Sequence, residues 1–206
     1  MITTVVFDFG NVVGFFSHRR SAEQVAALAG LDADEVLAFL YGGELERSFD
    51  GGGLAVEAYR ELVRRRFGLT AGDEVFDRAL GDMFTPNPEV CGLLPRLRPR
   101  YRLLLLSNTN AIHAASFRPQ FAAYFPHFDH LVLSHEVRLS KPDAAVYRHC
   151  EKLARVPPGE CLFIDDIAAN VEGARACGWH GLVYRPNDDL AGTLIRMGVK
   201  LSEPEA

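Results

Sequence analysis

The sequence lacks the features that mark a membrane, secreted or nucleic-acid-binding protein. Its apolar runs are all shorter than the ~20 residues that a bilayer-spanning helix needs. No basic residues precede the first apolar run, so we expect no signal peptide. The formal net charge of -5 at pH 7 gives no long-range attraction for nucleic acid or an anionic membrane. We therefore expect a soluble, cytoplasmic protein whose partners include neither nucleic acid nor a membrane.

Cysteine is also scarce. The four cysteines lie far apart, at positions 91, 150, 161 and 177, so their spacing suggests neither a zinc site nor a disulfide framework. Cys161 leads into an apolar run and Cys177 lies late in a helical pattern. We expect both to be reduced thiols of the core.

What the chain does have is an ordinary globular composition. Of its 206 residues, 48% are hydrophobic and 24% are charged, which argues against disorder. This length suits one domain with an insertion, or one domain plus a small second one.

The segment from 17 to 85 has a helical pattern throughout. Apolar residues recur at helical spacing over 19–31, 33–41, 54–67 and 73–84, and the polar stretch 44–53 between them predicts a loop. The segment 85–88, Thr-Pro-Asn-Pro, predicts an exit linker because proline ends helices. We therefore expect a small helical unit over 17–85.

From residue 89 onward, helices and strands alternate. Apolar runs predict strands at 102–106, 131–133, 161–164 and 181–184, in addition to the run that begins at Val5. Helices are expected over 89–98, where Pro95 should kink or shorten the helix, and over 111–125, 142–153, 168–177 and 188–197. This alternation predicts an α/β fold with a doubly wound parallel sheet formed by 1–16 and 86–201, followed by a frayed tail at 202–206.

Polar clusters follow three of the predicted strands. Asp8 ends the first, the run 107–110 (Ser-Asn-Thr-Asn) follows the second, and Asp165-Asp166 follows another. In a parallel sheet these ends meet at one edge, where α/β proteins bind ligands. Massed carboxylates repel one another, and Mg²⁺ bound through oxygen relieves the repulsion. Lys141 precedes another predicted helix and would bring a positive charge to the same edge, although an exposed loop lysine is the simpler interpretation of that residue alone.

Four motifs in order give the chain a family resemblance. Phe7-Asp8-Phe9-Gly10-Asn11-Val12, Ser107-Asn108, Lys141-Pro142-Asp143, and Asp165-Asp166 with Asn170 together resemble the haloacid dehalogenase-like hydrolase superfamily, most of whose members are phosphatases. Within it, the first two motifs look most like the branch that includes glucose-1-phosphate phosphatases. The resemblance implies a Rossmann-like core, with the helical unit 17–85 as an inserted α-helical cap.

The resemblance also implies roles for single residues. Asp8 would be the nucleophile that forms an aspartyl-phosphate. Ser107 and neighbouring amides, including that of Asn108, would hold the phosphoryl oxygens, and Lys141 would balance charge. Mg²⁺ would be bound by Asp8, the Gly10 carbonyl, Asp165 and Asp166, with Asn170 in support. The expected substrate is a small phosphorylated metabolite, with a sugar phosphate as one candidate.

Position 10 departs from the family pattern. The family's phosphatases usually have a general acid–base Asp there, and Gly10 keeps the carbonyl but has no carboxyl. General acid–base catalysis contributes roughly 10² to 10⁴-fold. Replacement groups could come from His18 or from the acids Glu44, Glu46 and Asp50. Substrate-specificity candidates are His18, Glu44 and Arg47.

Three functions therefore compete at this stage. The first is a Mg²⁺-dependent phosphatase, which needs the Asp165-Asp166 pair. The second is a metal-independent 2-haloacid dehalogenase, which Gly10 favours but the acidic pair opposes, because it would repel a carboxylate substrate. The third is a weakly active or non-catalytic binding protein, since resemblance in fold does not fix activity. We expect a monomer or a weak homodimer.

Overall fold

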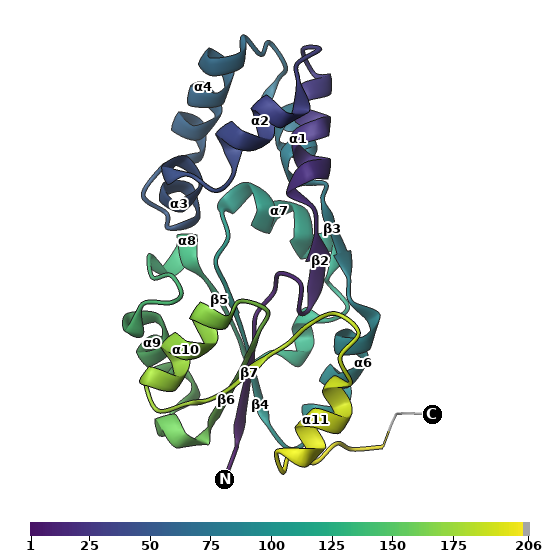
Figure 1. Cartoon of the computed structure of the whole chain (residues 1–206), viewed down its shortest axis with the longest axis vertical. Helices are drawn as coiled ribbons and strands as arrows, with labels where there is room; N and C mark the ends of the chain where they lie inside the picture. The colour runs from purple at the N-terminus through teal and green to yellow at the C-terminus, as the bar shows by residue number, and fades with distance from the viewer. Residues whose placement is uncertain (204–206) are drawn as a thin grey trace.

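The computed structural model describes residues 1–203, so residues 204–206 of the expected tail lie outside it. Its main body is a five-stranded parallel sheet in the order β5-β4-β1-β6-β7 (Figure 1). The strands are β1 Thr4–Phe7, β4 Arg102–Ser107, β5 His130–Leu133, β6 Cys161–Asp165 and β7 His180–Val183. The predicted α/β doubly wound fold is confirmed.

The register of the sheet aligns the ends of its three central strands. Phe7 of β1 pairs with Leu105 of β4 and with Ile164 of β6. Asp8 and Asp165 are the next residues after the paired Phe7 and Ile164, so they lie side by side. Ser107 lies two residues beyond Leu105, at the end of β4. The clusters meet at one edge because the strands are parallel and in register.

Helices cover both faces of the sheet. On one face α6 Pro88–Leu97, α7 Ala111–Gln120 and α11 Leu190–Arg196 contact the side that includes Val5 and Phe7. On the other, α9 Ala144–Ala154 and α10 Ala168–Ala176 contact Val6 (Figure 1). Alternate residues of β1 are thus buried on opposite faces, as strand geometry requires.

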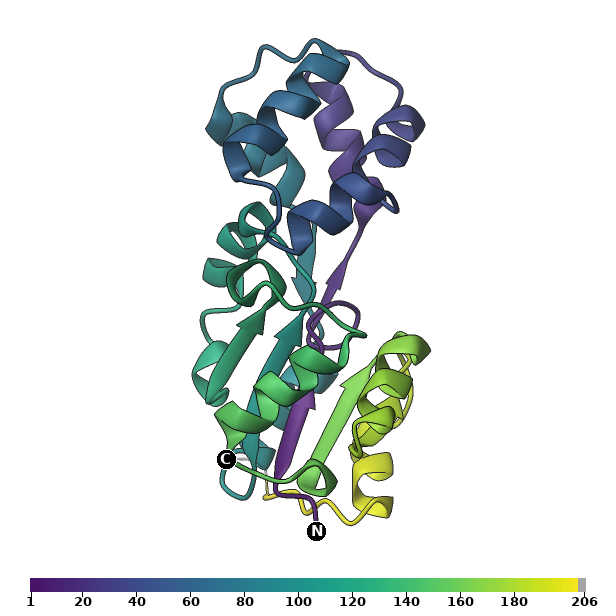
Figure 2. The same cartoon turned by 90° about the vertical axis from the view of Figure 1, so that its left-hand side faces the viewer.

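A helical insert, α1 to α5, extends from the carboxyl edge of the sheet (Figure 2). It comprises α1 His18–Ala27, α2 Ala33–Leu40, α3 Glu44–Asp50, α4 Val56–Phe67 and α5 Asp73–Gly81. An antiparallel ribbon of β2 Gly14–Phe16 and β3 Phe84–Pro86 connects it to the core. The ribbon was not predicted, and the expected linker at 85–88 begins inside β3. The domain boundaries at 16/17 and 85/86 remain a prediction.

Helix α3 corrects the expectation of a loop over 44–53. Phe49 is buried in the core of the insert and its ring stacks on Tyr59, with centroids 4.0 Å apart. Burial of this side chain stabilises a polar heptapeptide that would not form a helix alone. Tertiary packing thus overrides the local signal.

Other differences lie at the ends of elements. Helix α6 continues through Pro95 to Leu97, because Leu94 and Leu97 are buried against the sheet. The tail is anchored at its start, since the N–H of Ser202 donates to the Arg96 carbonyl (2.9 Å) and Nε of Arg96 donates to the Ser202 carbonyl (3.0 Å). Cys161 is buried as expected.

Two further expectations concerned Cys177 and membrane-spanning helices. Cys177 is half-buried rather than fully in the core. Across residues 1–203, every helix is too short or too polar to cross a bilayer.

Candidate active site

Asp8 stands at the centre of the sheet edge. Its N–H donates to the Ile164 carbonyl (2.8 Å), which continues the sheet pairing. Its Oδ1 accepts a hydrogen bond from the N–H of Phe9 (2.6 Å) and lies 2.6 Å from Nζ of Lys141. The residue is only 5% exposed. The carboxylate is therefore fixed by two donors in a largely dry environment.

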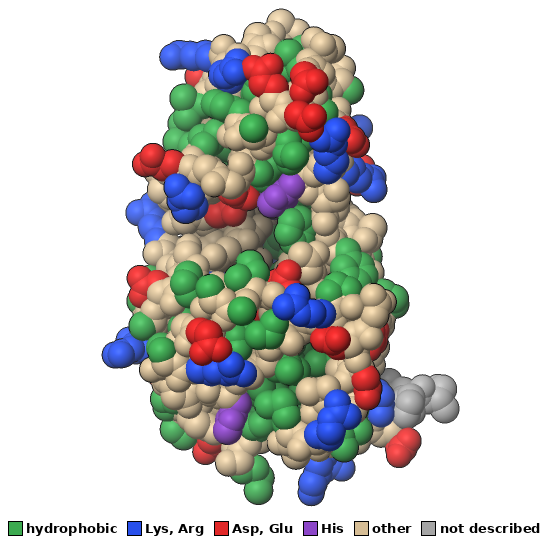
Figure 3. Space-filling view, viewed as in Figure 1, with side chains coloured by type: hydrophobic (Ala, Val, Ile, Leu, Met, Phe, Trp, Pro, Cys, Tyr) green, Lys and Arg blue, Asp and Glu red, His purple; other side chains and the backbone are tan. Residues whose placement is uncertain are grey.

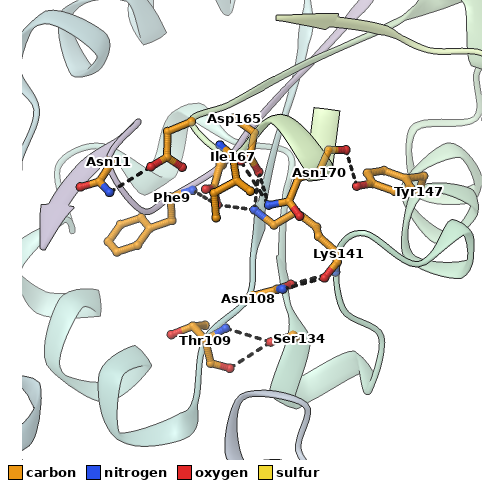
Figure 4. Close-up of polar contacts among 12 residues, drawn as sticks. Phe9, Asn11, Asn108, Thr109, Ser134, Lys141, Tyr147, Asp165, Ile167 and Asn170 are labelled. Carbon is orange, nitrogen blue, oxygen red and sulfur yellow. Dashed lines mark hydrogen bonds and ion pairs between the residues drawn. The ribbon is translucent and has the colours of Figure 1, made fainter. Parts of the chain in front are cut away.

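Lys141 connects two of the strand ends. Its Nζ also lies 2.7 Å from Oδ2 of Asp165, and the side chain is 2% exposed (Figure 4). Asn108 positions it, because the Asn108 side chain accepts from the Lys141 N–H and donates to the Lys141 carbonyl, both at 2.9 Å. Lys141 is thus a buried cation shared by two carboxylates, not an exposed loop lysine.

The two consecutive acids at the carboxyl end of β6 have different environments. Asp165 is fully buried, and its oxygens accept hydrogen bonds from the N–H of Ile167 (2.7 Å) and from Nδ2 of Asn170 (3.0 and 3.2 Å) (Figure 4). Asp166 is half-buried, and its Oδ2 accepts from Nδ2 of Asn11 at 3.0 Å. Asp165 therefore organises the site, whereas Asp166 is the more accessible acid.

Burial and mutual charge shift the pKa values of this group. Burial raises the pKa of Asp8 to about 7, against the lowering effect of Lys141. Burial opposes the charge of Lys141 itself, but the carboxylates of Asp8 and Asp165 outweigh it and raise the pKa of that ammonium. Burial also raises the pKa of Asp166. One ammonium among three carboxylates leaves an excess of negative charge.

A divalent cation fits this donor set. Asp8, Asp165 and Asp166 each offer a carboxylate oxygen, and these atoms lie within 4.8 Å of one another. Such hard oxygen donors suit Mg²⁺, which also keeps several waters.

A pocket of about 250 Å³ opens between this edge and the helical insert. Figure 3 shows the surface hollowed there, with histidine and acidic side chains on the insert side. The side chains that line the core wall include Asp8, Ser107, Asn108, Lys141, Asp166 and Asn170. Those that line the insert wall include Phe16, His18, Glu46, Asp50, Met83 and Phe84.

Not every candidate from the sequence lines this pocket. Ser107 is buried and lines it, and the Asn108 side chain is occupied by Lys141, which leaves the Asn108 amide N–H as its possible donor to a phosphate. His18 lines the pocket, but Glu44 and Arg47 are exposed and are not among its lining residues.

The helical spacing of α3 explains this difference. Glu46 and Asp50 are four residues apart and share one face, which turns toward the pocket. A loop over 44–53 offered no basis for choosing between these acids and their neighbours.

Phe16 accounts for the lack of a side chain at position 10. A Cβ added to Gly10 would lie 2.8 Å from Cε1 of the Phe16 ring. The Phe16 ring is partly buried, and its neighbours include Phe84, with centroids 6.4 Å apart, and His18, at 4.8 Å. An aromatic side chain therefore occupies the space into which a residue at position 10 would project.

Sequence reasoning named two further residues of the site, Asn11 and Asn110, but gave neither of them a role. Asn11, which orients Asp166, adopts a left-handed backbone (φ 55°), which the Gly10-Asn11 turn could have suggested. Asn110 is the N-cap of α7, and its side chain contacts both Asp50 and His113. An Asn directly before a helical run was the available signal.

Known proteins that are similar to this chain include hydrolases and phosphatases. A family model described as haloacid dehalogenase-like hydrolase matches residues 2–178. A D-ribitol-5-phosphate phosphatase from Bacteroides thetaiotaomicron is 26% identical over 185 residues, which is 87% of this chain and 90% of the relative. A phosphatase from Mycobacterium tuberculosis is 29% identical over 183 residues, 86% of this chain and 84% of that protein. A solved haloacid dehalogenase-family enzyme from Bacteroides thetaiotaomicron, in complex with magnesium and inorganic phosphate, has a TM-score of 0.83 at 22% identity, covering 94% of this chain and 99% of that one.

Proposed function

The chain belongs to the haloacid dehalogenase-like hydrolase family, and from that premise we propose that it is a Mg²⁺-dependent phosphatase acting through an aspartyl-phosphate on Asp8. Its substrate is a small phosphomonoester, with a sugar or polyol phosphate as the favoured class. One observation carries the proposal. The carboxylates of Asp8, Asp165 and Asp166 lie together at the carboxyl edge of the sheet, and the buried Lys141 ammonium contacts two of them. The resemblance of the first two motifs to the glucose-1-phosphate phosphatase-like branch supports this choice of substrate class.

The proposed chemistry has two steps. Asp8 forms a bond to phosphorus, and the leaving-group oxygen departs with its electron pair and takes up a proton. Water then attacks phosphorus and gives up a proton to the group that protonated the leaving oxygen, which breaks the acyl-phosphate bond, releases inorganic phosphate and restores the Asp8 carboxylate. Phe9 and Lys141 hold Oδ1 of Asp8, and Oδ2 has no partner among residues 1–203, so we assign the attack to Oδ2.

Charge is balanced by the surrounding residues. Asp8, the Gly10 carbonyl, Asp165 and Asp166 would hold Mg²⁺, which would neutralise phosphoryl charge when bound. Lys141 compensates the negative charge of nucleophile and phosphate, and Ser107 with the Asn108 amide would donate to phosphoryl oxygens. Asn170 keeps Asp165 in place.

Proton transfer requires a group other than residue 10. His18, Glu46 and Asp50 line the insert wall, and burial raises the pKa of Asp50 to about 7. A carboxyl with this pKa can both hold and release a proton near neutral pH, as general acid–base catalysis requires. We therefore assign this role to Asp50, and the helical insert acts as a cap over the site.

The second candidate function is 2-haloacid dehalogenase activity, which the glycine at position 10 favours. The same enzyme would have to bind a substrate carboxylate beside Asp8 and Asp166. The excess negative charge at this edge opposes such binding.

One assay separates these functions. Phosphate release from an aryl phosphate and a panel of sugar and polyol phosphates is measured with Mg²⁺ or EDTA, for wild type and Asp8→Asn. We expect release only from wild type with Mg²⁺. Release that persists in EDTA or in Asp8→Asn contradicts the proposal. Halide release from 2-chloropropionate would support the dehalogenase function. If neither phosphate nor halide is released, a binding protein is indicated.

A further inference from the structure

Glu46 places a carboxylate on the insert wall of the pocket that the proposed reaction leaves unused. It lies in the first turn of α3, and its side chain is 21% exposed. Oε2 accepts a hydrogen bond from the N–H of Gly42 (2.5 Å), whereas Oε1 has no hydrogen-bond partner within residues 1–203 and lies 3.8 Å from Nε2 of His18. In this part of the chain, the buried side-chain atoms without a partner are Oγ1 of Thr4 and Nε2 of His113, so Oε1 of Glu46 is open to solvent.

Little positive charge offsets this carboxylate. Burial lowers the pKa of His18, against the opposing charge of Glu46, so the neutral form of the neighbouring ring is favoured. That ring stacks on Tyr41, with centroids 3.9 Å apart and 9° between the planes. Among the pocket-lining residues described, the one Lys or Arg is Lys141, whose side chain is 2% exposed and is already shared by two carboxylates at the sheet edge. The insert side of the pocket is therefore negatively charged.

The leaving group of the proposed reaction extends toward this wall. Asp8 attacks from the core wall, and in phosphoryl transfer the attacking and leaving oxygens lie roughly in line through phosphorus. The leaving oxygen is thus on the insert side, where Glu46, Phe16 and Phe84 line the pocket. Coulomb interactions act over several ångströms at a partly buried site, so a charge on the leaving group interacts with Glu46 even without a direct hydrogen bond.

The sign of the charge on the leaving group decides how it interacts with Glu46. An ammonium is attracted and can donate a charge-assisted hydrogen bond to Oε1. A hydroxyl can donate to the same oxygen but carries no charge. A carboxylate or a second phosphate is repelled, because the insert wall offers no Lys or Arg among its described lining residues.

We propose that Glu46 is a specificity-determining residue that selects the leaving group by its charge, so that the preferred substrates are monophosphates of amino alcohols or amino sugars. This inference rests on the proposed phosphatase function and narrows its substrate class to members with an ammonium group. Neutral alcohols rank below them, and leaving groups with a carboxylate or a second phosphate rank last.

The stability of α3 alone does not account for the position of Glu46. A carboxylate in the first turn stabilises its own helix through the helix dipole, and Glu44 lies in the same turn. Glu44 is exposed and is not among the pocket-lining residues. The two acids therefore share the local helical role but differ in access to the pocket, which makes Glu44 the matched control.

The kinetic test uses three substrates that differ in one terminal group, namely phosphoethanolamine, 2-hydroxyethyl phosphate and phosphoglycolate. In the Mg²⁺-loaded wild type we expect kcat/KM to fall in that order, by about tenfold or more from first to last. Glu46→Gln keeps the shape of the side chain and removes its charge, so the ratio of first to last should fall about tenfold, mainly through KM. Glu44→Gln should leave this ratio within about twofold of wild type.

The ratio of two substrates is the deciding quantity because single rates have a second cause of change. Burial, and to a smaller extent the charge of Glu46, raises the pKa of Asp50, which affects all three substrates alike. Equal kcat/KM values in wild type, or a preference for phosphoglycolate, would overturn the proposal. So would an unchanged ratio in Glu46→Gln, or an equal fall in Glu44→Gln.

A binding measurement gives the same comparison without turnover. The phosphonates 3-aminopropylphosphonate, 3-hydroxypropylphosphonate and 3-phosphonopropionate carry the three terminal groups on a C–P bond that is not hydrolysed. Isothermal titration calorimetry of wild-type protein with Mg²⁺ should give Kd values that rise in this order, and Glu46→Gln but not Glu44→Gln should level them. No binding, or binding in another order, contradicts the inference even where phosphate esters are hydrolysed. The expected order without any phosphate release would support the role of Glu46 and contradict the phosphatase proposal alone.

Discussion

The two walls of the pocket are built differently. On the core wall, Asp8, Lys141 and Asp165 form contacts of 2.6 and 2.7 Å. The positions of Asp8 and Asp165 follow from the register of β1 and β6, and the Asn108 side chain at the end of β4 holds the loop of Lys141. On the insert wall, Nε2 of His18 lies 3.8 Å from Oε1 of Glu46, but burial lowers the pKa of His18, which disfavours a charged pair. The first wall is a fixed charge network, whereas the second is a set of separate side chains on helices.

This contrast suggests that the two walls have different roles in the reaction. A network whose members already compensate one another needs little reorganisation during the reaction, which favours electrostatic stabilisation of phosphoryl transfer. Separate polar groups on the insert can be exchanged without disturbing that network, so they suit proton transfer and recognition of the leaving group. Three substitutions test whether the walls are independent in this way.

The largest effect is expected at Lys141. Lys141→Met leaves the buried carboxylates of Asp8 and Asp165 without their cation, so we expect a loss of about 3–5 kcal/mol in the free energy of unfolding in EDTA. Urea denaturation measures it, and Mg²⁺ should restore part of the loss. Lys152→Met, at an exposed site, is the matched control and should change stability by less than about 0.5 kcal/mol. A loss below about 1 kcal/mol for Lys141→Met would show that the core wall is not a coupled network.

An intermediate effect is expected at position 10, where the walls meet. Gly10→Asp alone should destabilise the protein by about 1–3 kcal/mol because its Cβ overlaps the Phe16 ring. Combined with Phe16→Ala, the new carboxyl has room, and turnover of alkyl phosphates should rise about tenfold over Phe16→Ala alone.

The control for that pair replaces the acid with its isosteric amide. Gly10→Asn with Phe16→Ala fills the same space and cannot transfer a proton, so its rate should match Phe16→Ala. If both double variants accelerate turnover equally, the gain comes from packing, and the role assigned to the missing acid is wrong.

An effect of similar size, which is confined to high pH, is expected at Asp50. Its pKa is raised in the folded protein, so the native state binds more protons than the unfolded state between about pH 4 and 7. Its contribution therefore favours folding at low pH and is lost as pH rises through about 7. Asp50→Asn removes this titration and keeps an acceptor for Asn110.

Urea denaturation at two pH values checks this sign. Relative to wild type, Asp50→Asn should gain about 1–3 kcal/mol at pH 8 and nothing near pH 4. In the wild-type enzyme, kcat/KM should fall as pH rises through about 7, because Asp50 loses its proton there. In Asp50→Asn this fall should be absent. If the stability difference between the variant and wild type is the same at both pH values, the pKa of Asp50 is not raised by folding.

The core wall was largely predictable from sequence. Apolar runs that end at Asp8 and Asp165 define buried parallel strands, and parallel register brings their ends together. The place of Lys141 came from the family motif, since its loop gives no physical signal of burial. The structure adds what holds it there, namely the Asn108 side chain on its backbone.

The insert wall was much less predictable. Whether α3 is a helix depends on Phe49 meeting Tyr59, a contact between segments that local patterns do not relate. Without that helix, Glu46 and Asp50 could not be distinguished from Glu44, and the contact between Asp50 and Asn110 could not be expected. Similarly, Gly10 could be recognised as unusual, but only the packed ring of Phe16 gives the physical reason.

Covalent trapping tests the central claim most directly. Wild-type protein with Mg²⁺ and an aryl phosphate is quenched in acid during the first turnover, and the peptides are analysed by mass spectrometry. The account predicts a phosphoryl group on Asp8, absent in EDTA and absent in Asp8→Asn. Steady phosphate release with the phosphoryl group on another residue, or undiminished release by Asp8→Asn, would contradict it.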